Sequence, residues 1–215
     1  MLRAARRMPM RYPFFFGVGL STVKNGGADV LVQSQVEGVP LGAIDWRRTS
    51  VFAAFGCVFC GAWQYVLFVK TMPVLCPSAV AFAAKPLRAK LRDGAGLRQL
   101  CVQVFVENGL NNPLLYWPIF YSIKTFIEQP PGEKYSSREI VARGIARYSE
   151  TWREDILSIW KVWIPAQIVN FAFCPLWARV PFVASVSFFW TCYVSLVRGA
   201  PEDSADSTAS PRGEQ

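Results

Sequence analysis

Residues 159–195 read IWKVWIPAQIVNFAFCPLWARVPFVASVSFFWTCYVS, and this stretch decides the fold of the chain. Apolar and aromatic residues dominate it, yet prolines interrupt the helices that the pattern would otherwise build, at Pro165, Pro175 and Pro181. In lipid, prolines are tolerated where neighbouring helices satisfy the freed backbone groups. Polar side chains are tolerated there only when they face protein or water. The stretch therefore predicts proline-broken helices inside a membrane.

One side of this stretch is polar. Steps of three and four residues, which define one face of a helix, connect Trp160, Trp163, Gln167, Asn170 and Cys174. Both carboxamides then share one stripe, which we expect to face the interior of the protein.

The same stretch carries a resemblance to a known family. The residues that carry it, in family-like order and spacing, are Trp160, Trp163, Pro165, Gln167, Asn170, Phe171, Pro175, Arg179, Trp190, Tyr193 and Ser195. This order resembles the C-terminal signature of the Mpv17 / PMP22 family of mitochondrial and peroxisomal membrane proteins. One departure is that Ile164 stands between Trp163 and Pro165, where the family usually has proline directly after the second tryptophan.

Earlier segments extend the resemblance. Family-like elements occur at Asp29 and Gln33, at Asp45–Thr49, and at Glu107–Asn108 with Pro113. A family element that contains a histidine is altered here to Gly61–Phe68. The resemblance implies an integral protein of an organellar membrane, usually with four assigned spans, and a link to channel-like permeation and organelle homeostasis.

Composition excludes several classes of site. Over half of the residues are hydrophobic, which exceeds the need of a soluble domain of 215 residues. Histidine is absent, which excludes Ser-His-Asp and Cys-His catalysis and the HExxH zinc site. Cys57 and Cys60 have the spacing of a metal half-site, but no second pair or histidine accompanies them. We expect no catalytic residues, no cofactor and no metal site, and therefore no enzyme.

The charge distribution predicts the organisation of the chain. The net charge is +8, but its basic residues fall between apolar segments, so we expect lipid and not nucleic acid as the partner. Residues 1–13 form a basic segment, read equally as a mitochondrial targeting stretch or a juxtamembrane anchor. Residues 14–198 form a single transmembrane domain, and residues 199–215 form a polar, disordered tail.

Three further spans precede the deciding stretch. They are expected at residues 14–33, where Gly19 and Gly26 would contact the helices of residues 160–195, at residues 51–69, and at residues 97–123. The basic loop 84–98 is expected on the same side of the membrane as the N-terminus, which is the matrix side in a mitochondrion.

A capping box, Ser136 with Glu139, precedes an amphipathic helix that we expect to lie on the membrane until the chain enters it near Trp160. The predicted fold class is thus all-α: a polytopic membrane bundle of four to five transmembrane helices with an interfacial amphipathic helix.

Polar side chains recur at membrane depth and are the candidate site. In the third span Gln99, Gln103, Glu107 and Asn111 advance by fours and form a polar stripe. We expect a membrane-interior or pore-lining position for Asp29, Gln33, Gln103, Glu107, Asn108, Lys161, Gln167, Asn170 and Arg179. For Glu107, a salt bridge with Lys161 or Lys24 and a pore-lining role are equally weighted alternatives.

Two functions from different classes remain. One is a pore for ions or small solutes in the mitochondrial inner membrane, with the peroxisomal membrane as the alternative location. The other is a structural or accessory subunit of a larger inner-membrane assembly, in which the same polar groups only bond helix to helix. The first acts alone or as a homo-oligomer, whereas the second requires a larger membrane-protein complex.

Overall fold

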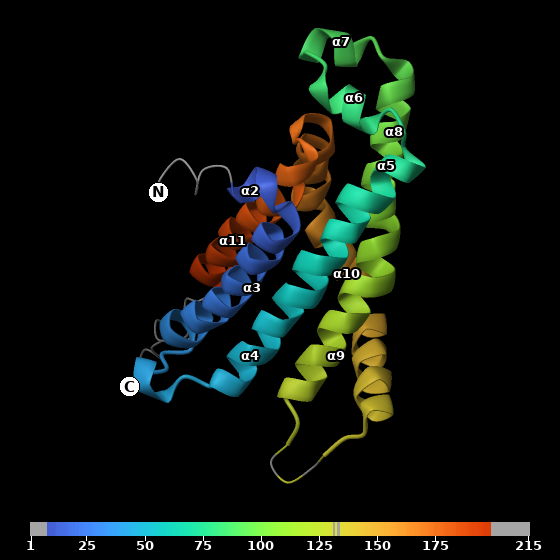
Figure 1. Ribbon diagram of the computed structural model, residues 1–215. Helices are drawn as coiled ribbons and strands as arrows, with labels where there is room; N and C mark the ends of the chain where they lie inside the picture. Colours follow the sequence, from blue (N-terminus) through green and yellow to red (C-terminus); the bar gives the residue numbers. More distant parts are fainter. Residues whose placement is uncertain (1–7, 131, 133, 199–215) are drawn as a thin grey trace, which may run out of the picture.

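In the computed structural model, which describes residues 8–130, 132 and 134–198, the chain forms helices and no strand within that part. The helices stack into five elongated rods that run alternately up and down (Figure 1). The first rod consists of α2 (Met8–Arg11), α3 (Pro13–Leu31) and η1 (Val32–Val36). The second consists of α4 (Trp46–Phe55), η3 (Gly56–Trp63), η4 (Val66–Thr71) and α5 (Met72–Leu75).

The third rod consists of α8 (Gly94–Phe105), η5 (Val106–Tyr116) and α9 (Trp117–Ile127). The fourth is α10 (Ser137–Phe173), and the fifth is α11 (Arg179–Arg198). Short connecting helices are η2 (Leu41–Ala43), α6 (Ala79–Ala84), α7 (Leu87–Leu91) and η6 (Leu176–Ala178). The all-α prediction is confirmed. Residues 1–7 and the tail 199–215, both parts of predicted domains, lie outside the described residues.

The apolar core lies where rods two to five meet below the α6–α7 cap. Phe68, Phe82 and Phe171 are buried there with Met72 and Val180. The Phe68 and Phe171 rings meet edge to face with their centroids 5.3 Å apart, which is a favoured geometry for aromatic pairs.

Two helices are apolar enough to cross a membrane by length and composition. Among the described residues these are the continuous helix Trp46–Leu75 and α10, while the apolar segment Leu176–Phe189 is shorter. The first and third rods have the length of a span but carry more polar residues. That five rods run side by side agrees with the upper end of the expected range of four to five spans.

The C-terminal signature folds differently from its predicted pattern. Pro165 does not interrupt a helix, because α10 continues through it from Ser137 to Phe173. Pro175 lies after the end of α10, and Pro181 lies in the first turn of α11, where a missing N–H costs nothing. The predicted amphipathic helix is therefore not a separate interfacial element but the first half of α10, and its capping box is confirmed.

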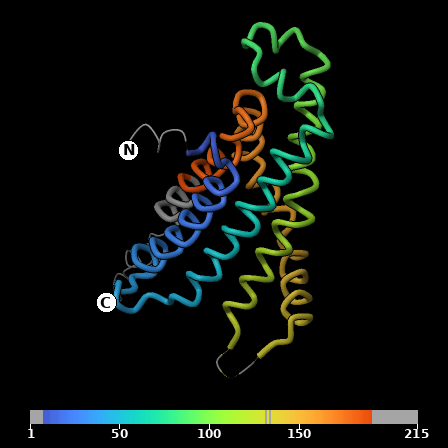
Figure 2. Tube along the Cα trace, in the orientation of Figure 1, coloured from blue at the N-terminus to red at the C-terminus, as the bar shows by residue number. Residues whose placement is uncertain are grey.

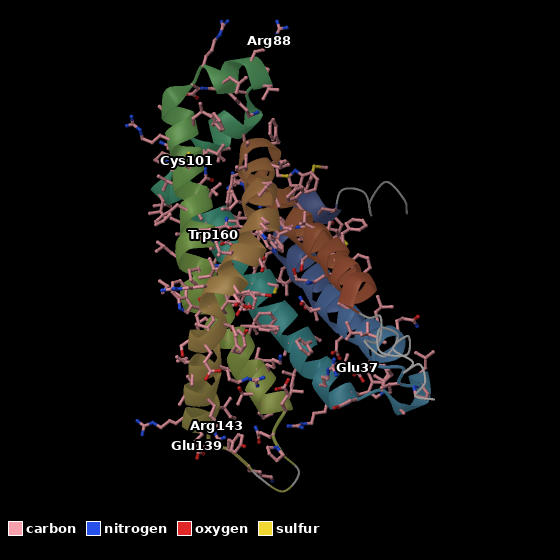
Figure 3. All side chains as sticks on the ribbon, turned by 180° about the vertical axis from the view of Figure 1, so that it is seen from behind. Glu37, Arg88, Cys101, Glu139, Arg143 and Trp160 are labelled. Carbon is pink, nitrogen blue, oxygen red and sulfur yellow. The ribbon has the colours of Figure 1, made fainter. Side chains whose placement is uncertain are left out.

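Helix α10 is longer than a bilayer is thick. At 37 residues it extends for about 55 Å, against a hydrocarbon core of about 30 Å. Its first half packs on α9, where Tyr121 donates a hydrogen bond of 2.7 Å to Asp155. Figure 3 shows Glu139 and Arg143 at the end of this hairpin and Trp160 about halfway along the molecule. An α10 that crosses the bilayer would therefore extend beyond the hydrocarbon.

The glycine contacts also differ from the prediction. The first rod does lie beside α11, as Figure 2 shows, but Gly19 has no neighbour within 4 Å of a Cβ placed on it. Gly26 faces Ala53 of α4, and it is Gly17 that faces α11, through Val180. The contact of the first span with the C-terminal stretch is thus confirmed, while its predicted glycines are wrong.

The expected topology gives a direct prediction. The structure places α2 and the basic α6–α7 cap at one end of the bundle and the α9–α10 turn at the other (Figure 1). In a background without the six cysteines, Arg11→Cys and Arg92→Cys should be labelled from the same side of the membrane. Glu128→Cys, near the α9–α10 turn, should be labelled from the opposite side. Opposite labelling of Arg11→Cys and Arg92→Cys would contradict the topology.

Candidate functional site

The candidate residues separate into two clusters and one surface position. Asp29 and Gln33 lie at the end of the first rod that faces α4. Lys161 is exposed on α10 and joins neither cluster. The second cluster lies inside the bundle and is called here the interior polar column. Its members are all buried, and they are Gln103, Glu107, Asn108, Asn111, Asn112, Gln167, Asn170 and Arg179.

The third rod supplies most of the column through one polar stripe. Gln103, Glu107 and Asn111 follow at intervals of four residues, so their side chains lie one above another on one face. Asn111 Nδ2 donates to the Glu107 carboxylate at 3.1 Å, and Asn108 Nδ2 donates to the carbonyl of Val104 at 3.1 Å. The stripe predicted from the sequence is confirmed as a buried face.

Glu107 has no cationic partner among the described residues. Its side chain is buried, and no ion pair joins it to Lys161 or Lys24. Lys24 Nζ instead donates to Ser187 Oγ at 2.7 Å. The salt bridge predicted as one alternative for Glu107 is therefore wrong.

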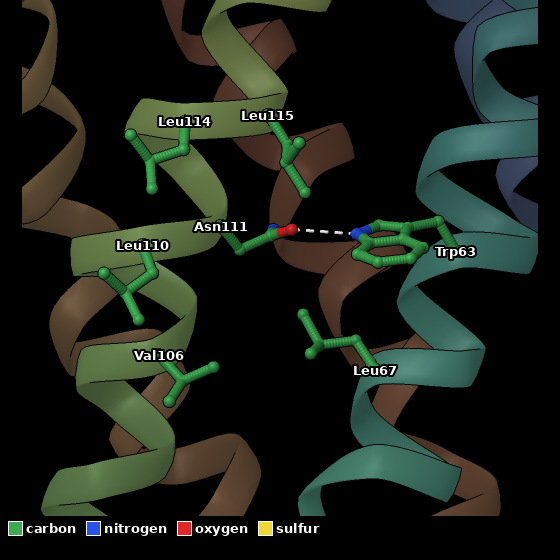
Figure 4. Close-up of a pocket in the computed structure, with 7 residues that line it drawn as sticks. All are labelled: Trp63, Leu67, Val106, Leu110, Asn111, Leu114 and Leu115. Atoms are coloured by element: carbon green, nitrogen blue, oxygen red, sulfur yellow. Dashed lines mark hydrogen bonds between the residues drawn. The ribbon is translucent and has the colours of Figure 1, made fainter.

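Two tryptophans connect the column to neighbouring rods. Trp63 Nε1 on the second rod donates to Asn111 Oδ1 at 2.8 Å (Figure 4). Trp160 Nε1 on α10 donates to the backbone carbonyl of Asn108 at 3.0 Å. These bonds fix the depth of the third rod against both of its neighbours. Trp160 was expected on the polar stripe and as a signature residue, whereas Trp63 was not singled out as a candidate.

Arg179 closes the column at the start of α11. The side chain is fully buried, and its Nη1 donates to the carbonyl of Phe68 at 2.9 Å and to Gln103 Oε1 at 3.5 Å. The guanidinium carbon lies 5.2 Å from the centre of the Phe171 ring, which is a cation–π distance. Its Nε and Nη2 have no partner, and neither do Gln167 Nε2 and Asn170 Oδ1. Gln167 and Asn170 bond to each other at 2.9 Å.

The other cluster is fully satisfied. The Asp29 carboxylate accepts hydrogen bonds from Gln33 Nε2 at 2.8 Å, Thr49 Oγ1 at 2.7 Å and Arg48 Nε at 2.8 Å. Arg48 Nη1 also bonds to Glu37 at 2.9 Å. The sequence predicts a membrane-interior or pore-lining position for Asp29 and Gln33, and the structure places both, buried, between the first rod and the start of α4. These hydrogen bonds therefore connect the first rod to the second.

A cleft opens beside the column between the second and third rods. Its volume is about 280 Å³, and the residues that line it are Trp63, Leu67, Val106, Leu110, Asn111, Leu114 and Leu115 (Figure 4). Six of these seven residues are apolar or aromatic, so the cleft fits an apolar group and not a hydrated ion.

The family signature lies along the same layer. Phe171 is fully buried in the core, and Trp163 packs on its edge. The side chains of Trp190, Tyr193 and Ser195 lie outside the part of the chain that the structure describes. The signature therefore builds the packing around Arg179 more than it lines an open space.

Comparisons with known proteins agree with this picture. The chain is 23% identical over 116 residues to Protein SYM1 of Mycosarcoma maydis, which covers 54% of the chain and 53% of that protein. It is 41% identical over 54 residues to the Mitochondrial inner membrane protein Mpv17 of Caenorhabditis elegans, covering 25% of the chain and 30% of that protein. The matches thus span about half or less of each relative. No solved structure matches the chain significantly.

The family comparison covers the hairpin of α10 and α11. The Mpv17 / PMP22 family matches residues 138–195, which include Arg179, Gln167 and Asn170. The resemblance seen in the sequence is confirmed over residues 138–195, which match the Mpv17 / PMP22 family.

Proposed function

We propose that the chain is an integral protein of the mitochondrial inner membrane, of the Mpv17 / PMP22 type, whose interior polar column is the closed form of a route for ions or small solutes. The location is supported by the relative from Caenorhabditis elegans that is named as a mitochondrial inner membrane protein. The peroxisomal membrane is the alternative location that the family allows.

The observation that carries the proposal is the pair of buried ionisable groups without counter-charge. Glu107 and Arg179 are at most 2% exposed, and neither forms an ion pair with a described residue. Each such group costs about 2.5 to 3.5 kcal/mol at the centre of a transmembrane helix. Two rods that served only packing would not need this cost, since apolar residues would fill the same space.

The backbone of the third rod supports the same reading. Segment η5, which carries Glu107, Asn108 and Asn111, is a π-helix of 11 residues. Such segments are frequent at functional sites, and η5 is longer than the π-helical segments η1, η3 and η4 of the first and second rods. A change from π to α winding within η5 would rotate the polar stripe relative to the rest of the rod. Such a rotation supplies a physical means of opening a route that this structure holds closed.

The replacement Glu107→Gln tests the proposed route. It removes the charge at nearly constant volume and breaks no ion pair, because none joins Glu107 to a described residue. We expect the purified variant to fold with wild-type yield and, in planar bilayers, to lose preference for cations over anions. The exposed Glu150→Gln on α10 is the matched control and should keep wild-type selectivity. Unchanged selectivity in Glu107→Gln would contradict the role of Glu107 in the route.

The cleft favours a second candidate, an accessory subunit of a larger membrane complex. Its lining of leucines, Val106 and Trp63 is suited to apolar side chains from a partner helix. A subunit of this kind would purify with a partner at fixed stoichiometry and would show no conductance when reconstituted alone. A pore would conduct without a partner.

A further inference from the structure

The two Arg179 nitrogen atoms without hydrogen-bond partners, Nε and Nη2, lie on the same edge of the guanidinium. A guanidinium carries five N–H groups in a planar fork. Nη1 uses its two on Phe68 and Gln103, which leaves the edge formed by Nε and Nη2 without any partner. The N–H groups on this edge point in parallel, and this is the edge that pairs with both oxygens of a carboxylate or phosphate.

No group among the described residues fills this edge. No carboxylate of the described residues lies within 4.0 Å of Arg179. The side chain of Arg179 is fully buried, and its guanidinium lies beside the buried Phe171 ring, so this edge is enclosed within the protein. A buried cation without its counter-ion, together with unsatisfied donors, is among the costliest arrangements in a protein. An anion on this edge would remove both costs at once.

The neighbouring amides add one donor and one acceptor. Asn170 directly precedes Phe171, so the Gln167–Asn170 pair lies within one helical turn of the ring that carries Arg179. The pair leaves Gln167 Nε2 and Asn170 Oδ1 unpartnered. Reversing both amides would exchange these roles and again leave one donor and one acceptor. A hydrogen phosphate group, which has both acceptor oxygens and a hydroxyl, satisfies more of these atoms than a carboxylate.

We propose that Arg179, with Gln103 and the Gln167–Asn170 pair beside it, forms an internal binding site for an oxyanion that presents two oxygens, with phosphate preferred over carboxylate. The unpartnered atoms are covered in this structure, so the anion enters as the surrounding side chains move. The site does not depend on conduction. It requires only the unpartnered donors of Arg179, which an accessory subunit would carry as well.

Thermal unfolding of the purified chain in a non-ionic detergent tests the site. At constant ionic strength and sodium concentration, replacing chloride by phosphate should raise the unfolding midpoint to a plateau, and acetate should raise it less. Chloride has one atom and cannot bridge the two nitrogens. Broadening of the phosphorus NMR signal of free phosphate by the protein should accompany the rise. Equal midpoints in phosphate and chloride, without broadening, would overturn the proposal.

Two variants assign the effect to Arg179. Arg179→Lys keeps a positive charge but lacks the fork, so the response to phosphate should be lost. Arg98→Lys, at an exposed position of α8, is the matched control and should keep the response. Retention of the response in Arg179→Lys would indicate general charge screening, and loss of it in both variants would show that the effect is not specific to Arg179; either result would contradict the site.

A third variant covers the case in which Arg179→Lys does not fold. Gln103→Glu places a carboxylate within hydrogen-bond distance of Arg179 Nη1 at nearly constant volume. This internal counter-ion should raise the midpoint in chloride and abolish the further rise in phosphate. A Gln103→Glu protein that responds to phosphate as the wild type does would exclude the site.

The source of the oxyanion is distinguished by one further comparison. If the natural occupant is a lipid headgroup, short-chain phosphatidate should bind more tightly than inorganic phosphate. Short-chain phosphatidylcholine, whose phosphate is blocked by choline, should not compete. If the occupant is a free anion, the two phosphate ligands should bind with similar affinity.

Discussion

Asp29→Ala is expected to destabilise the folded chain by about 3 kcal/mol. The carboxylate is 3% exposed and accepts three hydrogen bonds, from Gln33, Thr49 and Arg48. Breaking a buried charge pair by removing one partner commonly costs about 3 to 5 kcal/mol. We expect the lower end because Arg48 keeps its bond to Glu37, so that its charge is not left unpaired. The denaturant midpoint in detergent, followed by tryptophan fluorescence, measures the loss.

Glu37→Ala is the matched control from the same cluster. Glu37 bonds to the same arginine at 2.9 Å but is 40% exposed, and exposed ion pairs contribute only about 0.2 to 1 kcal/mol. A loss from Glu37→Ala as large as that from Asp29→Ala would show that burial does not set the strength of this cluster. The two rods would then be held together by their apolar contacts alone.

Gly56→Ala is expected to have the next largest effect. A Cβ at this position of η3 would lie 2.5 Å from the backbone carbonyl oxygen of Ser21 on α3 and 2.8 Å from Cβ of Asn25. Because the first of these is backbone, the two rods must move apart to accommodate one methyl group. Overpacking of this kind costs about 1 to 3 kcal/mol, and the same denaturation experiment detects it.

Gly19→Ala makes the same chemical change in open space. Nothing lies within 4 Å of a Cβ at Gly19, and alanine is favoured over glycine in a helix by about 1 kcal/mol. This variant should therefore be neutral or slightly more stable than the wild type. Equal destabilisation by both substitutions would point to a backbone effect of glycine and not to the close approach of α3 and η3.

The positions of the helical rods can be predicted well from the sequence, because each rod follows from a local pattern of residues. The apolar run at 51–69, the stripe at Gln103, Glu107 and Asn111, and the capping box at Ser136 all appear where expected. The prediction that Pro165 breaks a helix is wrong. This proline removes only one backbone hydrogen bond, and an otherwise favourable helix of 37 residues outweighs that loss.

Side-chain partners are predicted less well, since they depend on how the rods are arranged around one another. Gly19 and Gly26 share a stripe in the sequence, but only Gly26 meets a neighbouring rod. A salt bridge with a lysine was one of two alternatives for Glu107, yet its partner is Asn111, one turn along the same helix. No local pattern shows that Arg179 reaches the carbonyl of Phe68, which is 111 positions earlier in the chain.

That only two described helices are apolar enough to cross a membrane has a consequence for biogenesis. Trp46–Leu75 and α10 can partition into lipid by themselves. The third rod, which carries Glu107 and three asparagines, can do so only at a high free-energy cost. During synthesis that rod emerges after Trp46–Leu75 and before α10. Its integration therefore favours a hairpin with α10 as the inserting unit, in which Asn108 already bonds to Trp160. Translation arrest before α10 should leave residues 94–127 outside the bilayer.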